Sequence, residues 1–172
     1  GLYVTPGLVD IHVHVYTGTA LRASSARTDT NVQADAFSFR SGVTTMVDAG
    51  TSGWKNFPDF RDGVIKKSRT RILAMLNIVS AGMGTAAGEN DPSGMDPEAS
   101  AKMANENPEY VVGFKSAHYA GPGWSSIDNA VKAGNLANVP VMVDFGSITK
   151  DRNLDGLLRD KLRPGDIYTH CY

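Results

Sequence analysis

The chain has 172 residues, of which 41% are hydrophobic, and its 17 basic and 18 acidic side chains leave a net charge of −1. This length is enough for one domain with a sizeable core, and the balanced charge gives no electrostatic basis for binding nucleic acid or an anionic membrane surface. No apolar run approaches the roughly 20 residues needed to cross a bilayer. The single cysteine, Cys171, excludes an internal disulfide.

The first predicted element is a buried strand over residues 6–14, with the sequence PGLVDIHVH. Side chains two residues apart on a strand point to the same face, so His12 and His14 project together. As neutral imidazoles they suit Zn²⁺ or a related divalent metal. For so short a motif, a pair of hydrogen-bonded core histidines is an equally good interpretation. On the alternate positions, Val9, Ile11 and Val13 predict a face that packs against a covering layer.

The rest of the chain alternates between helices and strands, with a polar loop over residues 16–29 and a second loop, rich in Gly, Ala, Ser and Pro, over residues 80–94. Ser41 and Gly42 end the first helix, while Asp96 and Pro97 suit the N-cap and first position of a later one. The predicted helices cover residues 31–40, 57–68, 97–105, 126–136 and 154–161. The predicted strands that follow the first cover residues 43–48, 71–79, 110–115, 139–144 and 166–171.

Six strands joined by five helical segments imply parallel pairing through right-handed crossovers. An open doubly wound sheet and a (β/α)₈ TIM-type barrel both fit this alternation. Polar residues at the carboxyl ends of the strands favour the barrel, which gathers its active site there; they are His14, Asp48, Lys115, Asp144 and His170. A barrel takes about 250 residues and eight strands. We therefore expect residues 1–172 to form one incomplete α/β barrel domain of about six βα units, with further chain before Gly1 and after Tyr172.

Several segments carry a family resemblance. The opening PGLVDIHVH resembles the first strand of the amidohydrolase superfamily, and VGFK at 112–115 and YTHC at 168–171 resemble its fourth and sixth strands. AGTSG at 49–53 and LRPGD at 162–166 support the match. Within the superfamily, the chain resembles the amidohydrolase/deacetylase metallohydrolases, a dihydroorotase-like group.

The resemblance implies a site for two divalent metal ions, zinc first and manganese as the alternative. His12 and His14 would bind the more buried ion, and His170 the second. Lys115, carboxylated by CO₂, would bridge both ions. A free lysine has a pKa of about 10.4 and cannot ligate while protonated, whereas its carbamate is an anionic oxygen ligand. The alternative for Lys115 is a surface lysine at the end of a strand, but its apolar neighbours Val111, Val112 and Phe114 favour the ligand.

Asp144 departs from the pattern, because most dinuclear relatives carry a histidine at the end of the fifth strand. An aspartate oxygen can still bind zinc at about 2.0–2.2 Å, and its negative charge favours a harder ion such as Mn²⁺. We treat Asp144 as a metal ligand. The alternative is that Asp144 does not reach the metal and contacts the ligands instead.

Four further residues have expected roles around the site. His118 and Tyr119 follow the lysine on a loop, where His118 could polarise a substrate carbonyl and Tyr119 could contact substrate. Asp10, deeper in the first strand, and Asp48, at a strand end, are expected to orient ligands rather than bind metal.

The predicted activity is hydrolysis of an amide (C–N) or ester bond in a small acylated substrate, deacetylase-like, by a metal-activated water. The alternatives are a cyclic-amide hydrolase of the dihydroorotase or hydantoinase kind, a deaminase, and a non-catalytic homologue. In relatives an aspartate at the end of the eighth strand takes the proton from the water, and no such strand is expected before Tyr172. We expect a small-molecule substrate as the partner, not nucleic acid or membrane. The expected location is the cytoplasm. The sequence does not decide whether the protein forms a homo-oligomer.

Overall fold

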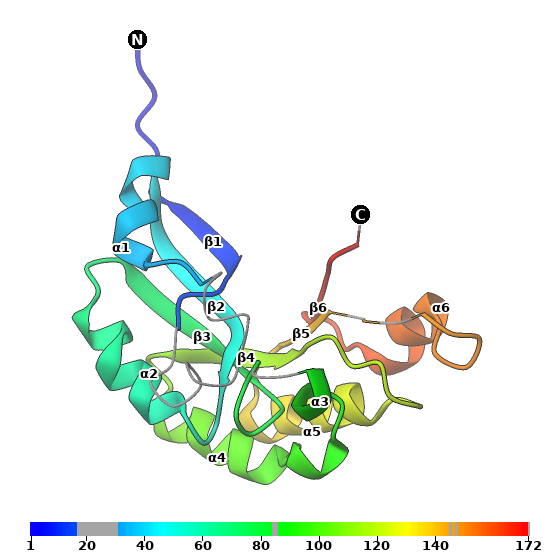
Figure 1. Ribbon diagram of the computed structural model, residues 1–172. Coiled ribbons are helices and arrows are strands. Elements are labelled where there is room, and N and C mark those ends of the chain that lie inside the picture. Colours follow the sequence, from blue (N-terminus) through cyan, green and yellow to red (C-terminus); the bar gives the residue numbers. More distant parts are fainter. Residues whose placement is uncertain (17–30, 84–85, 145, 147, 172) are drawn as a thin grey trace.

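The computed structural model describes residues 1–16, 31–83, 86–144, 146 and 148–171. Six strands form one sheet in chain order, and all five pairings are parallel. Figure 1 shows this sheet curled like part of a barrel, with helices on its convex side. The strands are β1 (Leu8–Val13), β2 (Val43–Gly53), β3 (Arg71–Asn77), β4 (Val111–Ser116), β5 (Val141–Asp144) and β6 (Ile167–Thr169). The predicted incomplete barrel is confirmed.

The helices match the predictions where they cover the sheet and are shorter elsewhere. They are α1 (Ala34–Phe37), α2 (Phe57–Gly63), α3 (Ala86–Glu89), α4 (Pro97–Glu106), α5 (Ser125–Ala137) and α6 (Leu154–Gly156). Short 3₁₀ turns follow α1 at Phe39–Ser41, α2 at Ile65–Lys67 and α3 at Pro92–Gly94, and a π-helical turn at Leu157–Lys161 follows α6.

The start of α4 shows how local sequence sets an element boundary. Asp96 lies before the helix and its carboxylate accepts a hydrogen bond from the backbone N–H of Ala99 at 2.9 Å, while Pro97 occupies the first position. Both residues act as predicted, because the carboxylate satisfies an N–H that the first turn leaves unpaired and proline has no N–H to lose there.

Several predicted boundaries are wrong. The strands predicted over 71–79 and 166–171 are shorter, at Arg71–Asn77 and Ile167–Thr169. The helix predicted over 31–40 forms only as α1 and a 3₁₀ turn, which Gly42 ends with a φ of +76°. The loop predicted over 80–94 contains α3 and a 3₁₀ turn. The strand predicted to end at Asp48 continues to Gly53, because β3 keeps pairing with it up to Asn77. In the other predicted loop, over 16–29, residues 17–29 lie outside the described residues.

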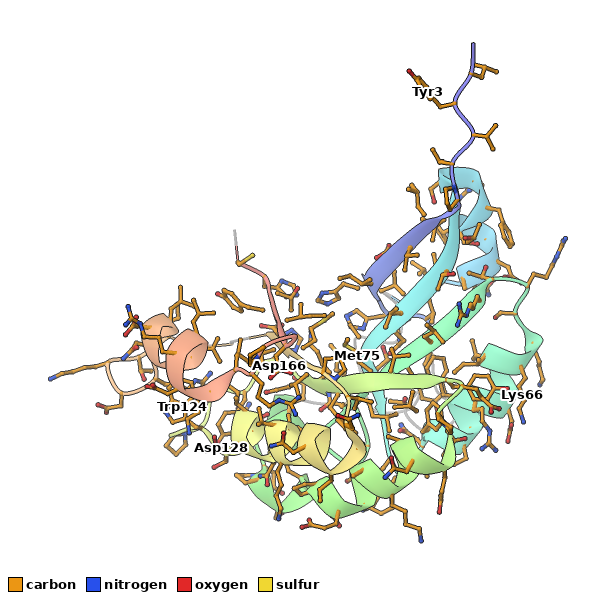
Figure 2. All side chains as sticks on the ribbon, turned by 180° about the vertical axis from the view of Figure 1, so that it is seen from behind. Tyr3, Lys66, Met75, Trp124, Asp128 and Asp166 are labelled. Atoms are coloured by element: carbon orange, nitrogen blue, oxygen red, sulfur yellow. The ribbon has the colours of Figure 1, made fainter. Side chains whose placement is uncertain are left out.

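The apolar side chains divide between the two faces of the curled sheet. The larger cluster fills the space between sheet and helices and includes Phe57, Phe60 and Phe114, all fully buried. A smaller cluster, on the other face, contains Val47, Ala49, Met75 and Met142; Met75 is labelled in Figure 2. Alternation along each strand sends successive side chains to opposite faces, so both layers follow from the strand period of two.

The prediction that β1 is buried is wrong. Val9 is 59% exposed and Ile11 is 48% exposed, and only Val13 packs partly against the core. The reason is that β1 is the edge strand and pairs, within the described ranges, with β2 alone. In the part of the chain that the structure describes, no helix has the length and apolar character that crossing a membrane requires.

Candidate active site

The three strand-end histidines meet at the carboxyl edge of the sheet. His14 directly follows β1 and His170 directly follows β6, at opposite ends of the strand order. The curl of the sheet brings them together around His12, whose ring centroid lies 5.6 Å from that of His14 and 5.0 Å from that of His170. Both ring pairs are edge-on. The structure therefore gathers three of the predicted metal ligands in one place.

Threonine hydroxyls orient two of these rings. His12 Nδ1 lies 2.9 Å from Thr169 Oγ1, and His14 Nδ1 lies 2.9 Å from Thr51 Oγ1. Such bonds to the second ring nitrogen are how proteins usually fix a ligating imidazole. Neither pairing could be predicted, because each threonine lies far along the chain from its histidine.

His12 is held in its neutral form. Its pKa falls to about 4, first because the ring is partly buried and then because the positive charges of Lys115, His14 and His170 oppose a further proton; Asp144 acts weakly in the opposite sense. A neutral imidazole has the lone pair that metal binding requires. These charge interactions place Lys115 and Asp144 near His12.

Lys115 is a buried lysine, not the surface lysine of the alternative interpretation. Its exposure is 1%, and its Nζ lies 4.0 Å from the sulfur of Met142. Burial lowers its pKa to about 8, although the negative charges of Asp144, Asp48 and Glu89 act against this. Near neutral pH a useful fraction of the amine is therefore unprotonated, which is the form that can react with CO₂.

Gly50 makes room for this lysine. A Cβ at Gly50 would lie 2.6 Å from Cγ and 2.7 Å from Cβ of Lys115, and the φ of +90° at Gly50 is unfavourable for other residues. Glycine is therefore required at this position of the AGTSG segment, because a larger residue would collide with Lys115.

Both oxygens of the Asp144 carboxylate have partners. Oδ1 accepts a hydrogen bond from the backbone N–H of Gly146 at 3.3 Å. Oδ2 lies 3.0 Å from His118 Nε2 and 3.6 Å from His170 Nε2. Burial raises the pKa of Asp144, but the hydrogen bond and charge of His118 outweigh this and lower the pKa to about 2.

His118 bridges two carboxylates. Its Nδ1 lies 3.1 Å from Glu89 Oε2, opposite the contact of Nε2 with Asp144. Its pKa rises to about 9 because Asp144 and then Glu89 accept hydrogen bonds from the ring, and partial burial only reduces the effect. His118 therefore carries a positive charge at neutral pH. Its expected contact with a substrate carbonyl stays a prediction.

The side chains of the three remaining predicted residues form hydrogen bonds with backbone groups. Asp48 is fully buried inside β2 and accepts hydrogen bonds from the N–H groups of Val15 at 2.9 Å and Thr51 at 2.8 Å. Burial raises its pKa to about 6. Asp10 accepts a hydrogen bond from the N–H of His12 at 3.1 Å. Tyr119, expected to contact substrate, is 2% exposed and donates its hydroxyl proton to the carbonyl of Pro122 at 3.1 Å.

The donor set fits a divalent metal only if Lys115 takes part. Within the described ranges, histidine, cysteine, aspartate and glutamate alone form no group of three or more arranged to hold a metal ion. Lys115 is a buried amine beside His12, with a sulfur atom as its hydrogen-bond contact. Its carbamate would add anionic oxygen to the neutral imidazoles of the histidines, a mixture that zinc accepts.

Two proteins with similar sequences are both named deacetylase. The chain is 32% identical to a protein named deacetylase from Agrobacterium fabrum, over 100% of this chain and 41% of the relative. It is 31% identical to a deacetylase from Brucella anthropi, over 100% of this chain and 42% of the relative. The chain thus spans about two fifths of the length of these curated relatives. No protein-family model matches it.

Two solved structures match the fold closely. An adenine deaminase superposes with a TM-score of 0.84 at 27% identity, covering 99% of this chain and 44% of that one. A dihydroorotase superposes with a TM-score of 0.80 at 33% identity, covering 96% of this chain and 44% of that one. The fold is part of a TIM-type barrel, and the strand-end histidines lie at its carboxyl edge. The matches confirm the resemblance to the amidohydrolase superfamily, including its deacetylase and dihydroorotase-like members.

Proposed function

We propose that this chain contributes the metal-binding half of a hydrolase that cleaves an amide or ester bond of a small acylated substrate, in the manner of a deacetylase. The observation that carries the proposal is the meeting of His12, His14 and His170 beside the buried Lys115. Sequence relatives named deacetylase support this substrate class. The small-molecule substrate and a cytoplasmic location belong to the same proposal.

Each site residue has a role in this proposal. His12 and His14 would hold one divalent ion, zinc or manganese, and His170 with Asp144 would hold the second. Lys115, if carboxylated by CO₂, would supply anionic oxygen to the metal site. When bound, such ions lower the pKa of a water toward about 7 and polarise a carbonyl. Thr51 and Thr169 keep the rings of His14 and His12 oriented, and Asp10 and Asp48 hold the strands that carry them.

A second candidate has its own support. The adenine deaminase and the dihydroorotase match the fold over 99% and 96% of this chain. The described site residues do not distinguish their activities from deacetylation. Cleavage of a cyclic amide, or deamination, is therefore the alternative activity. A panel of N-acetylated amines, acyl esters, dihydroorotate and adenine separates the three: hydrolysis confined to the acylated compounds supports the deacetylase-like proposal.

The test of the metal centre is the Lys115→Ala variant. We expect the wild-type protein to hold divalent metal after dialysis and Lys115→Ala to lose most of it, because the carbamate supplies anionic oxygen to the metal site in the proposal. The matched control is Lys102→Ala, since Lys102 is 76% exposed on α4. Metal content is measured by elemental analysis. A Lys115→Ala protein with undiminished metal would remove Lys115 from the site, and short carboxylic acids should partly restore binding if it belongs there.

A further inference from the structure

Glu89 is a buried carboxylate that has no role in the proposed function so far. It lies in α3, its exposure is 2%, and its Oε2 is 3.1 Å from His118 Nδ1. Its other oxygen, Oε1, is buried with no hydrogen-bond partner among the residues described. Burying a carboxylate is unfavourable unless it is paired. The contact with His118 must therefore offset a considerable loss of hydration.

His118 connects Glu89 to the site. The two nitrogens of its ring face two different carboxylates, Glu89 on one side and Asp144 on the other. Its backbone φ is +51°, a region that residues other than glycine seldom occupy. Strained backbone of this kind persists only where the surroundings hold it. Here the two carboxylates hold the ring at both ends.

The loop that carries His118 is also fixed on both flanks. Asn90, next to Glu89, accepts a hydrogen bond from the N–H of Ala120 at 2.6 Å. Arg152, from the segment after β5, donates to the carbonyl oxygens of Tyr119 and Gly121. The segments that follow β3, β4 and β5 are therefore linked around His118.

We propose that Glu89 is a positioning residue: through His118 it fixes the Asp144 carboxylate beside His170. This inference rests on the proposed function, because the orientation of Asp144 matters only if this edge binds metal. Without the negative charge at position 89, the imidazole keeps one anionic partner instead of two. Asp144 then loses its fixed direction toward His170.

The link itself is tested in metal-free protein by a mutant cycle. Glu89→Gln, Asp144→Asn and the double variant are unfolded in urea, with His118 present and again in a His118→Ala background. Groups in one hydrogen-bonded network show non-additive effects. We expect the unfolding equilibrium constant of the double variant to differ at least about five-fold from the product of the single effects, and additivity to return without His118. If Glu89→Gln does not fold, Glu89→Asp, which has a shorter reach, replaces it.

Additive effects in the presence of His118 would overturn the link whether or not the protein binds metal. The positioning role is then tested by calorimetric titration with Zn²⁺ and Mn²⁺. Loss of a partner behind a metal ligand typically weakens binding 10–100-fold, so we expect Glu89→Gln to bind at least about ten-fold more weakly than wild type. The control is Glu106→Gln, which changes a side chain 55% exposed on α4.

Each outcome of the titration has a distinct meaning. Coupling in the cycle together with weaker metal binding supports the positioning role. Coupling with unchanged metal affinity makes Glu89 a purely structural contact and overturns the role. A wild-type protein that binds neither ion contradicts the proposed function itself, and the positioning role with it.

Discussion

Replacing Gly50 by alanine tests how the site makes room for Lys115. The new Cβ would lie 2.6 Å from Cγ and 2.7 Å from Cβ of Lys115, well inside the 3.5–4.0 Å at which carbon atoms normally touch. The Cβ of Lys115 is attached directly to the backbone of β4, so a change of side-chain rotamer cannot move it away. The alanine must therefore shift a strand or displace the lysine.

Two terms add up in this variant. A left-handed backbone costs a residue with a Cβ about 1–2 kcal/mol, and inserting a methyl group into a filled space typically costs about 1–3 kcal/mol more. We expect the free energy of unfolding to fall by about 2–5 kcal/mol in total. Metal content should fall as well, because Lys115 no longer keeps its position beside His12.

Two other glycines separate the terms. Gly123 has a φ of +67° with no atom within 4 Å of a built Cβ, so Gly123→Ala should lose only the backbone term. Gly63, at the end of α2, has its nearest neighbour at 4.0 Å, so Gly63→Ala should change stability by no more than about 0.5 kcal/mol. Urea unfolding of the three variants gives the comparison. Equal losses for Gly50→Ala and Gly123→Ala would refute the claim that Lys115 fills the space above Gly50.

Two further predictions concern other ionised groups. Since the pKa of His118 is raised to about 9, its protonated form stabilises the folded state fully below pH 6.5, and the contribution is lost as the pH rises through 9. In metal-free protein, the stability difference between wild type and His118→Ala should be largest near pH 6 and shrink above pH 9; a difference independent of pH would contradict the ion pairs. Asp166, labelled in Figure 2, pairs with Arg163 at 2.8 Å and accepts the N–H of Val141 at 2.8 Å. Asp166→Ala should cost about 1–3 kcal/mol in urea unfolding because it removes the acceptor of the Val141 N–H, while Arg163, which is 27% exposed, keeps its bonds to Asn135 and to the carbonyl of Val139. Asp128→Ala, which breaks an exposed pair with Lys161, should cost at most about 1 kcal/mol.

The strand framework was predictable because each strand has a strong local signal. Val43 to Val47 and Val139 to Val143 are rich in β-branched residues, and helical segments lie between the strands. Parallel order then follows from the crossover connections. The polar residues at strand ends were predictable for the same reason, since the carboxyl ends of parallel strands share one edge. Asp48 was misplaced because Gly50, Ser52 and Gly53 resemble a turn, yet pairing with β3 keeps them extended.

Glu89 could not be found from the sequence. It lies in a segment rich in Gly, Ala and Ser that shows no helical periodicity, and its partner His118 follows 29 residues later. The threonines that orient His12 and His14 are equally distant in sequence from their partners. Contacts of this kind depend on the curl of the sheet, which no local pattern encodes. A buried carboxylate with a histidine partner is visible only once the strands are in place.

The structure gives a physical reason why an aspartate is acceptable at the end of the fifth strand. The Asp144 carboxylate adds a negative charge to the edge, where Asp48 and Glu89 also act on Lys115. That charge does not stand alone, because protonated His118 lies 3.0 Å from Asp144. Glu89 in turn keeps His118 protonated from the other side. Asp144 therefore has its own counter-charge, and Glu89, His118 and Asp144 have to be considered as one unit.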